Sequence, residues 1–116
     1  MKLSRADLAK RIFQVSHLTG EFKLRSGKTS NEYFDKYRFE AKPDLLRAIG
    51  EQMALLVPAG VDALAGLEMG GIPVSTAISL EKGIESIFVR KEAKEYGTIR
   101  IAEGLPTLDG KRLCII

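Results

Sequence analysis

The chain has 116 residues, which is enough for one domain and short for two domains of ordinary size. Its 45% of hydrophobic and 28% of charged residues are ordinary for a soluble globular protein. The net charge of +3 permits an anionic ligand, but basic and acidic residues are interleaved, so we expect no nucleic-acid partner. No apolar run approaches the ~20 residues of a membrane span, and the N-terminus has no apolar signal core. We therefore expect a cytoplasmic protein with no membrane partner.

A single cysteine and a single histidine limit the metal and redox chemistry. Cys114 can form no internal disulfide or thiolate cage, and its apolar neighbours predict a small buried residue. His17 lies at the end of a predicted helix, where a cation suits the helix dipole, and suggests no catalytic role. We therefore expect no zinc site.

The first 42 residues predict a helix and a β-hairpin. Ser4 and Asp7 resemble a capping box ahead of apolar residues at helical spacing, so we expect a helix over about residues 4–16 that is broken at Thr19 and Gly20. Two strands are predicted next, over residues 21–26 and 32–39, with the turn between them at residues 26–28.

The remainder predicts an α/β core. Pro43 fits the first turn of a helix that ends before Pro58, with one apolar face formed by Leu45, Leu46, Ile49, Met53 and Leu56. Short apolar strands are predicted over residues 61–66, 85–90 and 111–116, and a helix over residues 73–82. Strand, helix and strand in this order favour parallel pairing with a right-handed crossover, in a sheet covered on both faces.

A basic segment follows the predicted strand at residues 85–90. Arg90, Lys91 and Lys94 open a loop that runs to about residue 107, and two glycines in it would let it swing. Ligand crevices lie beyond the carboxyl ends of parallel strands, so these cations would stand at the mouth of the crevice and could neutralise a polyphosphate. A solvated surface loop whose glutamates cancel the charge explains the spacing equally well.

Gly70 and Gly71 follow the first core strand and precede a helix. Small residues there let backbone amides approach an anion at the helix N-terminus. A pair of glycines is more often only a tight turn, so this pattern alone does not establish an anion site.

Arg25 stands beside the predicted hairpin turn, and Tyr33 and Phe34 follow the turn. Together they could bind a planar anionic base, with the cation at its edge and a ring on its face. A hairpin with cross-strand aromatic packing explains the same residues and is favoured on physical grounds alone.

Taken together, four segments resemble the orotate phosphoribosyltransferases, which are type I phosphoribosyltransferases. They are residues 20–28 (GEFKLRSGK), 33–35 (YFD), 70–73 (GGIP) and, most diagnostic, 90–97 (RKEAKEYG), in the family's order and at its approximate spacing. The resemblance implies an α/β fold with a parallel sheet flanked by helices. Residues 1–42 would form a base-binding hood of a helix and a β-hairpin. Residues 43–116 would form an incomplete core, truncated at the third core strand, with a flexible basic loop at about residues 91–107.

The resemblance also implies a reaction, in which orotate and phosphoribosyl pyrophosphate give orotidine monophosphate and pyrophosphate. Mg²⁺ would be bound through the pyrophosphate substrate, and the basic loop would act in trans within a homodimer. Arg25 would take the family's usual lysine position near the reacting ribose and base, and would serve catalysis together with Lys94. Tyr33 and Phe34 would lie against the orotate ring. The remaining substrate contacts would come from Gly70, Gly71, Arg90, Lys91 and Tyr96.

The chain departs from the family pattern in three places. Some members have a lysine beside the Gly-Gly turn, where this chain has Met69 and Gly70, so one phosphate contact is absent or supplied otherwise. Tyr96 stands where many members have histidine, and a phenol is a poor acid–base shuttle at neutral pH. The family's Thr- and Gly-rich loop for the ribose phosphate would begin after Ile116. We therefore expect the chain by itself not to catalyse the full reaction.

Three hypotheses stay open at this point, because a fold does not fix a function. The chain is part of an enzyme, a non-catalytic module that senses a nucleotide or binds RNA, or an interaction protein that keeps a dimerisation surface. The three loop cations favour the enzyme. An extended basic surface with exposed aromatic residues, which would favour RNA binding, is not apparent in the sequence.

Overall fold

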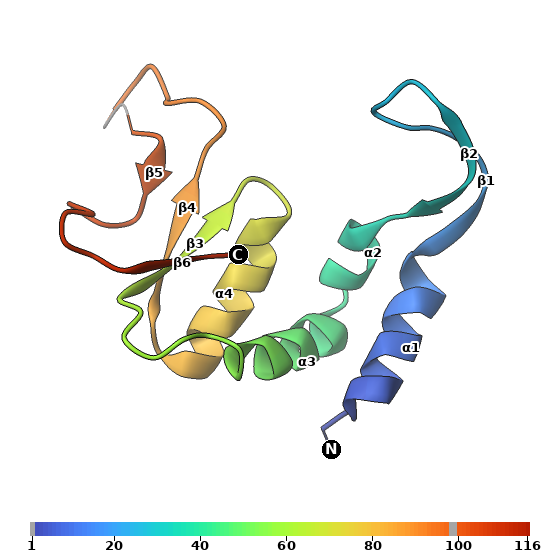
Figure 1. Cartoon of the computed structure of the whole chain (residues 1–116), viewed down its shortest axis with the longest axis horizontal. Coiled ribbons are helices and arrows are strands. Elements are labelled where there is room, and N and C mark those ends of the chain that lie inside the picture. Colours follow the sequence, from blue (N-terminus) through green and yellow to red (C-terminus); the bar gives the residue numbers. More distant parts are fainter. Residues whose placement is uncertain (1, 98–99) are drawn as a thin grey trace.

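The computed structural model describes residues 2–97 and 100–116 and places two separate sheets at opposite ends of an α/β fold (Figure 1). One sheet is an antiparallel hairpin of β1 (His17–Lys23) and β2 (Thr29–Phe34). The other is a four-stranded sheet in the order β5-β4-β3-β6, and a row of helices connects the two. In the described part of the chain, no helix is long and apolar enough to cross a membrane.

The first helix, α1 (Arg5–Ser16), begins where the sequence predicts, because the Ser4 hydroxyl accepts a hydrogen bond from the Asp7 amide at 3.1 Å. The helix ends at Ser16, as predicted, but the expected break at Thr19 and Gly20 is wrong, because β1 begins directly at His17. The His17 ring stacks on Phe13 with centroids 4.5 Å apart, and its Nε2 lies 3.2 Å from Glu32 Oε1.

The hairpin is confirmed, with its turn at residues 24–28, but both predicted strands are misplaced toward the C-terminus. β1 starts four residues earlier than expected and contains an irregularity in register between Thr19 and Phe22. Gly20 lies in this irregularity with φ +152°, a conformation that L side chains rarely adopt. The shift places the pair His17 and Phe34 at the base of the hairpin.

The predicted strand over residues 32–39 is wrong in its second half. β2 ends at Phe34, and α2 (Lys36–Glu40) follows. Asp35 caps this short helix, since its Oδ1 accepts a hydrogen bond from the Tyr37 amide at 3.1 Å. The capping geometry stops the strand and turns the chain back toward α1.

The third helix, α3 (Pro43–Ala54), has Pro43 in its first turn, as predicted. Leu45 and Ile49 are buried against Leu8 of α1 and form the first core cluster. Leu56, expected on the same face, lies beyond the helix end and is 77% exposed. The Arg11 guanidinium, whose Nη2 lies 2.7 Å from Asp44 Oδ2, holds the pKa of that carboxyl below its ordinary value and links α1 to α3.

The core sheet confirms the predicted strand, helix and strand unit. β3 (Ala63–Leu67), α4 (Gly71–Lys82) and β4 (Glu85–Val89) follow one another, and β3 pairs in parallel with both β4 and β6 (Leu113–Ile115). α4 packs against β3 and β4. The second core cluster joins Ala54, Leu64 and Ile78, and Cys114, which is half-buried, packs against it.

One strand was missed in the sequence. β5 (Ala102–Glu103) lies inside the segment expected to be a loop and pairs antiparallel with the end of β4. Its register sets Glu103 opposite Phe88 and Ala102 opposite Val89. The basic segment therefore leaves the sheet at Arg90 and returns to the same edge at Ala102.

Candidate functional site at the carboxyl edge of the parallel strands

Two chain segments meet beyond the carboxyl ends of β3 and β4. The turn after β3 is joined to the start of the basic segment by two hydrogen bonds of Glu68. Its amide donates to the Val89 carbonyl at 2.8 Å, and its carboxylate Oε1 accepts from the Lys91 amide. A cavity of about 220 Å³ lies at this edge, lined by Glu68, Ile72, Phe88, Val89, Arg90 and Glu103. Parallel strands bring ligand-binding loops together at this kind of edge.

Glu103 holds two of the three predicted cations. Its Oε2 lies 2.7 Å from Lys94 Nζ and 3.3 Å from Arg90 Nε. Lys94 is also 5.6 Å from the centroid of the Tyr96 ring, a cation–π contact. The Lys91 side chain is exposed, while its backbone is fixed by Glu68. The cations thus gather near the strand ends, and a carboxylate of the same segment neutralises part of their charge.

The start of α4 packs closely against β3 and the end of β6, so a side chain at Gly66 or Gly71 would clash. A Cβ on Gly66 would lie 2.9 Å from the Ser75 Cβ, and one on Gly71 would lie 2.8 Å from the Ile116 carbonyl oxygen. Gly70 is the N-cap of α4 and offers no side-chain cap, and the first helical turn contains no acidic residue. The Ile72 amide donates to the Met69 carbonyl at 3.1 Å, and Pro73 has no N–H. The amides of Gly70 and Gly71 are therefore the ones that remain to bind an anion at the start of α4.

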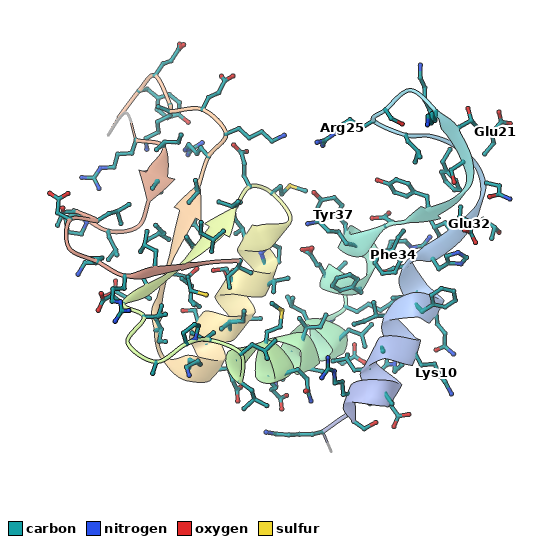
Figure 2. All side chains as sticks on the ribbon, in the orientation of Figure 1. Lys10, Glu21, Arg25, Glu32, Phe34 and Tyr37 are labelled. Atoms are coloured by element: carbon teal, nitrogen blue, oxygen red, sulfur yellow. The ribbon has the colours of Figure 1, made fainter. Side chains whose placement is uncertain are left out.

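The predicted base-binding residues belong to the hairpin. Arg25 is exposed in the turn of the hairpin, and its side chain points from there toward the core sheet, as does Tyr37 from α2 (Figure 2). Tyr33 stacks on Phe22 across the strands with centroids 5.5 Å apart, whereas Phe34 lies 6.2 Å from the Phe39 ring. As successive residues of β2, Tyr33 and Phe34 direct their rings to different neighbours, and their contact with a base stays a prediction.

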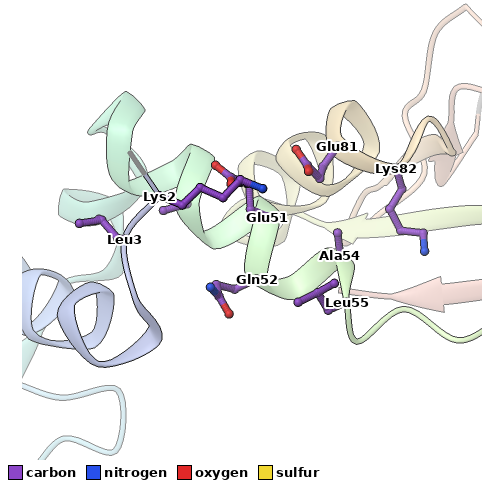
Figure 3. Close-up of a pocket in the computed structure, with 9 residues that line it drawn as sticks. Lys2, Leu3, Glu51, Gln52, Ala54, Leu55, Glu81 and Lys82 are labelled. Atoms are coloured by element: carbon purple, nitrogen blue, oxygen red, sulfur yellow. Dashed lines mark ion pairs between the residues drawn. The ribbon is translucent and has the colours of Figure 1, made fainter.

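A second hollow, of about 450 Å³, lies at the opposite end of α4, between α3 and the N-terminal residues (Figure 3). Lys2 Nζ and Glu51 Oε2 are 3.2 Å apart there, and Glu81 and Lys82 add one further charge of each sign. The lining charges balance, so this hollow does not suit a polyphosphate.

Sequence reasoning missed three residues at this edge: Lys36, Glu68 and Glu103. Lys36 was assigned to a strand, although Asp35 before it is a common helix-capping residue and could have indicated α2. Glu103 was treated as part of a polar loop. Glu68 stands next to the glycine turn, but no local signal marks its bond to Lys91, because the two are 23 positions apart in sequence.

No family model matches the chain, but individual relatives and solved structures do. An orotate phosphoribosyltransferase from a Nocardioides species is 50% identical over 111 residues, which are 96% of this chain and 62% of that protein. A crystal structure of the Mycobacterium tuberculosis orotate phosphoribosyltransferase in complex with Fe(III) dicitrate aligns with a TM-score of 0.80 and 32% identity over 96% of this chain. A complex of the M. tuberculosis enzyme with phosphoribosyl pyrophosphate aligns with a TM-score of 0.72 and 27% identity.

The chain spans less than two thirds of the relatives that it matches. It covers 62% of the Nocardioides protein and 65% of the M. tuberculosis chain with Fe(III) dicitrate. Within that span, the relatives agree with the resemblance to orotate phosphoribosyltransferases that the sequence showed. The mixed, mostly parallel sheet flanked by helices also matches the fold that the resemblance implied.

Proposed function

We propose that this chain, which is related to orotate phosphoribosyltransferases in sequence and in fold, is the part of such an enzyme that binds the diphosphate of phosphoribosyl pyrophosphate and one face of orotate. The complete enzyme would transfer the phosphoribosyl group to orotate and release pyrophosphate. In this proposal residues 1–42 are the base-binding hood and residues 43–116 are the phosphate-binding core.

One observation carries the proposal: the glycine turn and the basic segment meet at one edge of the sheet and are joined there by Glu68 and the Lys91 amide. The Gly70 and Gly71 amides at the start of α4 would bind one phosphate, while Arg90, Lys91 and Lys94 would approach the diphosphate from the other side. An incoming diphosphate would compete with Glu103 for Arg90 and Lys94, so the two cations would exchange one anionic partner for another.

The charges suit the chemistry of the proposed reaction. Breaking the bond between ribose and pyrophosphate leaves cationic character on the sugar and additional negative charge on the leaving group. Cations held in fixed positions, in a site that is closed to water, stabilise that charge. Arg25 would act near the ribose and the base, Tyr33 or Phe34 would contact the orotate ring, and Tyr96 would donate a hydrogen bond to phosphate rather than transfer a proton.

Mg²⁺ would enter the site with the diphosphate rather than on a protein cage. Among the described residues there is no group of three or more His, Cys, Asp or Glu side chains that could hold a metal ion. Phosphate oxygens are good Mg²⁺ ligands, and Mg²⁺ commonly binds through substrate phosphates. We propose further that the enzyme is a cytoplasmic homodimer in which the basic loop reaches the partner's site.

A segment joined after Ile116 would begin at the proposed site. The Ile116 amide donates to the Ala65 carbonyl at 2.9 Å, and its own carbonyl oxygen lies against Gly71. Residues that follow this position in the longer relatives would start beside the glycine turn, and would be placed to bind the ribose phosphate.

A chimera tests the proposal directly. Residues 1–116 are joined to the remaining C-terminal segment of the Nocardioides relative, and formation of orotidine monophosphate is measured by chromatography. We expect turnover by the chimera and none by the 116-residue chain. Lys94→Ala in the chimera should lower kcat by on the order of 10²–10³, as for loss of one contact to developing charge.

Lys111→Ala is the control, because Lys111 is a lysine of the core that is exposed and precedes β6, away from the proposed site. It should leave turnover unchanged. A folded chimera that binds neither orotate nor phosphoribosyl pyrophosphate would overturn the proposed function and return weight to a non-catalytic module of the same fold.

A further inference from the structure

The side chain of Lys36 lies directly over Gly70. A Cβ added to Gly70 would overlap with Nζ and Cε of Lys36, so the end of the lysine occupies the space that a side chain at position 70 would need. Gly70 is the N-cap of α4. The ammonium group of Lys36 therefore stands at the N-terminus of the helix that follows the glycine turn.

The first residue of α2 is held in place from two sides. The Asp35 side chain caps the helix through the Tyr37 amide, and the Asp35 amide donates to the Ser16 carbonyl at 2.9 Å. Further along α2, Phe39 packs against the first core cluster. These contacts anchor α2 to α1 and the core, so Lys36 projects toward α4 from a fixed backbone.

The charge of Lys36 is not neutralised by an ion pair. Among residues 2–97 and 100–116, no carboxylate lies within 4.0 Å of its ammonium group. Glu68, two residues before Gly70, accepts a hydrogen bond from the Lys91 amide. Since the first turn of α4 contains no acidic residue, Lys36 and the helix N-terminus present positive potential together.

We propose that Lys36 is a phosphate-binding residue of this site, contributing from the hood the ammonium group that pairs with a phosphate held by the Gly70 and Gly71 amides at the start of α4. The inference rests on the proposed function and adds a residue to it. It also gives α2 a role, because this short helix carries the cation from the hairpin unit to the core.

The end of Lys36 fills the space that a side chain at position 70 would need. Lys36→Arg keeps the charge and nearly the same reach, so it should retain the affinity for pyrophosphate that Lys36→Ala removes. A purely structural role for Lys36, through the Tyr37 ring at 5.7 Å or through Glu40, would lower the melting temperature of the variants and leave the affinity of the folded chain for pyrophosphate unchanged.

The test is pyrophosphate binding by the 116-residue chain, measured by isothermal titration calorimetry at low salt. Lys36→Met keeps the length of the side chain and removes the charge. We expect affinity for pyrophosphate to fall about tenfold, which corresponds to about 1.4 kcal/mol, as for loss of one charge-assisted contact. Lys36→Arg should bind nearly as the parent does, and Lys10→Met, on the outer side of α1 (Figure 2), should not differ from it.

The outcomes separate the two proposals. Parent and Lys36→Met chains that bind pyrophosphate equally, with equal melting temperatures, would overturn the role of Lys36 and leave the proposed function intact. A parent chain that is folded by circular dichroism but binds no pyrophosphate would overturn both. If Lys36→Met unfolds, Lys36→Arg decides the matter, and a folded Lys36→Arg chain with no pyrophosphate affinity contradicts the inference.

Discussion

Glu40 is the most unusual titratable residue of the chain. It is 7% exposed, and within the described residues neither carboxylate oxygen has a hydrogen-bond partner. Burial raises the pKa of Glu40 above its ordinary value, and the positive charge of Lys36, four residues earlier on α2, opposes that rise in part. An ionised carboxylate in such a place opposes folding, whereas a protonated one costs much less.

This environment predicts a pH-dependent effect of Glu40→Gln. Because the folded state binds the Glu40 proton more tightly than the unfolded state does, the favourable contribution of this group is full below its ordinary pKa. It is lost as the pH rises through the pKa in the folded state. A glutamine side chain at this position is neutral at every pH, so the variant should be more stable than the parent at pH 8, by on the order of 1 kcal/mol.

Urea unfolding at pH 4 and pH 8 measures this difference, which should shrink toward pH 4. Glu21→Gln is the control, because Glu21 is an exposed glutamate of the hairpin (Figure 2) and should give no pH-dependent gain. A stability gain for Glu40→Gln that is the same at both pH values would contradict the assignment to ionisation of the buried carboxylate.

At the residue scale, the sequence predicts the cations of the basic segment better than it predicts the residues that contact them. Arg90, Lys91 and Lys94 form a local pattern that is readable without coordinates. Glu103, which holds two of them, and Lys36, which lies over Gly70, act across sequence separations that no local pattern reports. Their contacts arise from strand register and helix placement, and these are properties of the folded chain.

Among the elements, α3, α4 and the parallel strands were predictable because each has an apolar periodicity or an apolar run with clear ends. The segment after the hairpin was not predictable, because the mixed aromatic and polar residues at positions 33–39 fit a strand as well as a short helix. Asp35 decides between them by capping α2. This capping bond thus begins a helix of five residues where a strand was expected, and it places Lys36 at the first position of that helix.

The contact between α3 and α4 predicts a large effect of a small substitution. A Cβ on Gly50 would lie 2.9 Å from both the Cβ and the carbonyl oxygen of Ala77, and backbone cannot move aside as a flexible side chain can. Gly50→Ala should therefore lower the free energy of unfolding by about 1–3 kcal/mol, although alanine is the better helix former. Urea unfolding should show no such loss for Arg47→Ala, an exposed position of the same helix. Equal or greater stability for Gly50→Ala would show that the helices can separate at no cost.

At the scale of the whole molecule, the proposed base site and the proposed phosphate loop belong to different ends of the chain. Arg25 lies in the hairpin turn, while Lys94 lies beyond β4, folded onto Glu103, with 17% of its side chain exposed. Within the described residues, no hydrogen bond or ion pair joins the hairpin to the basic segment. A loop that opens from Glu103 can therefore serve its own chain or a neighbouring one.

Complementation between two variants of the chimera distinguishes these arrangements. Arg25→Ala and Lys94→Ala should each remove most of the activity. If the loop acts in trans, mixing and reassembling the two should restore roughly a quarter of the parent activity, since half of randomly assembled dimers are mixed and each holds one intact site. If the loop acts in cis, each protomer of a mixed dimer carries its own defect and no activity returns. Light scattering on the same samples confirms that dimers are present, so absence of recovery would count against the trans arrangement and not against assembly.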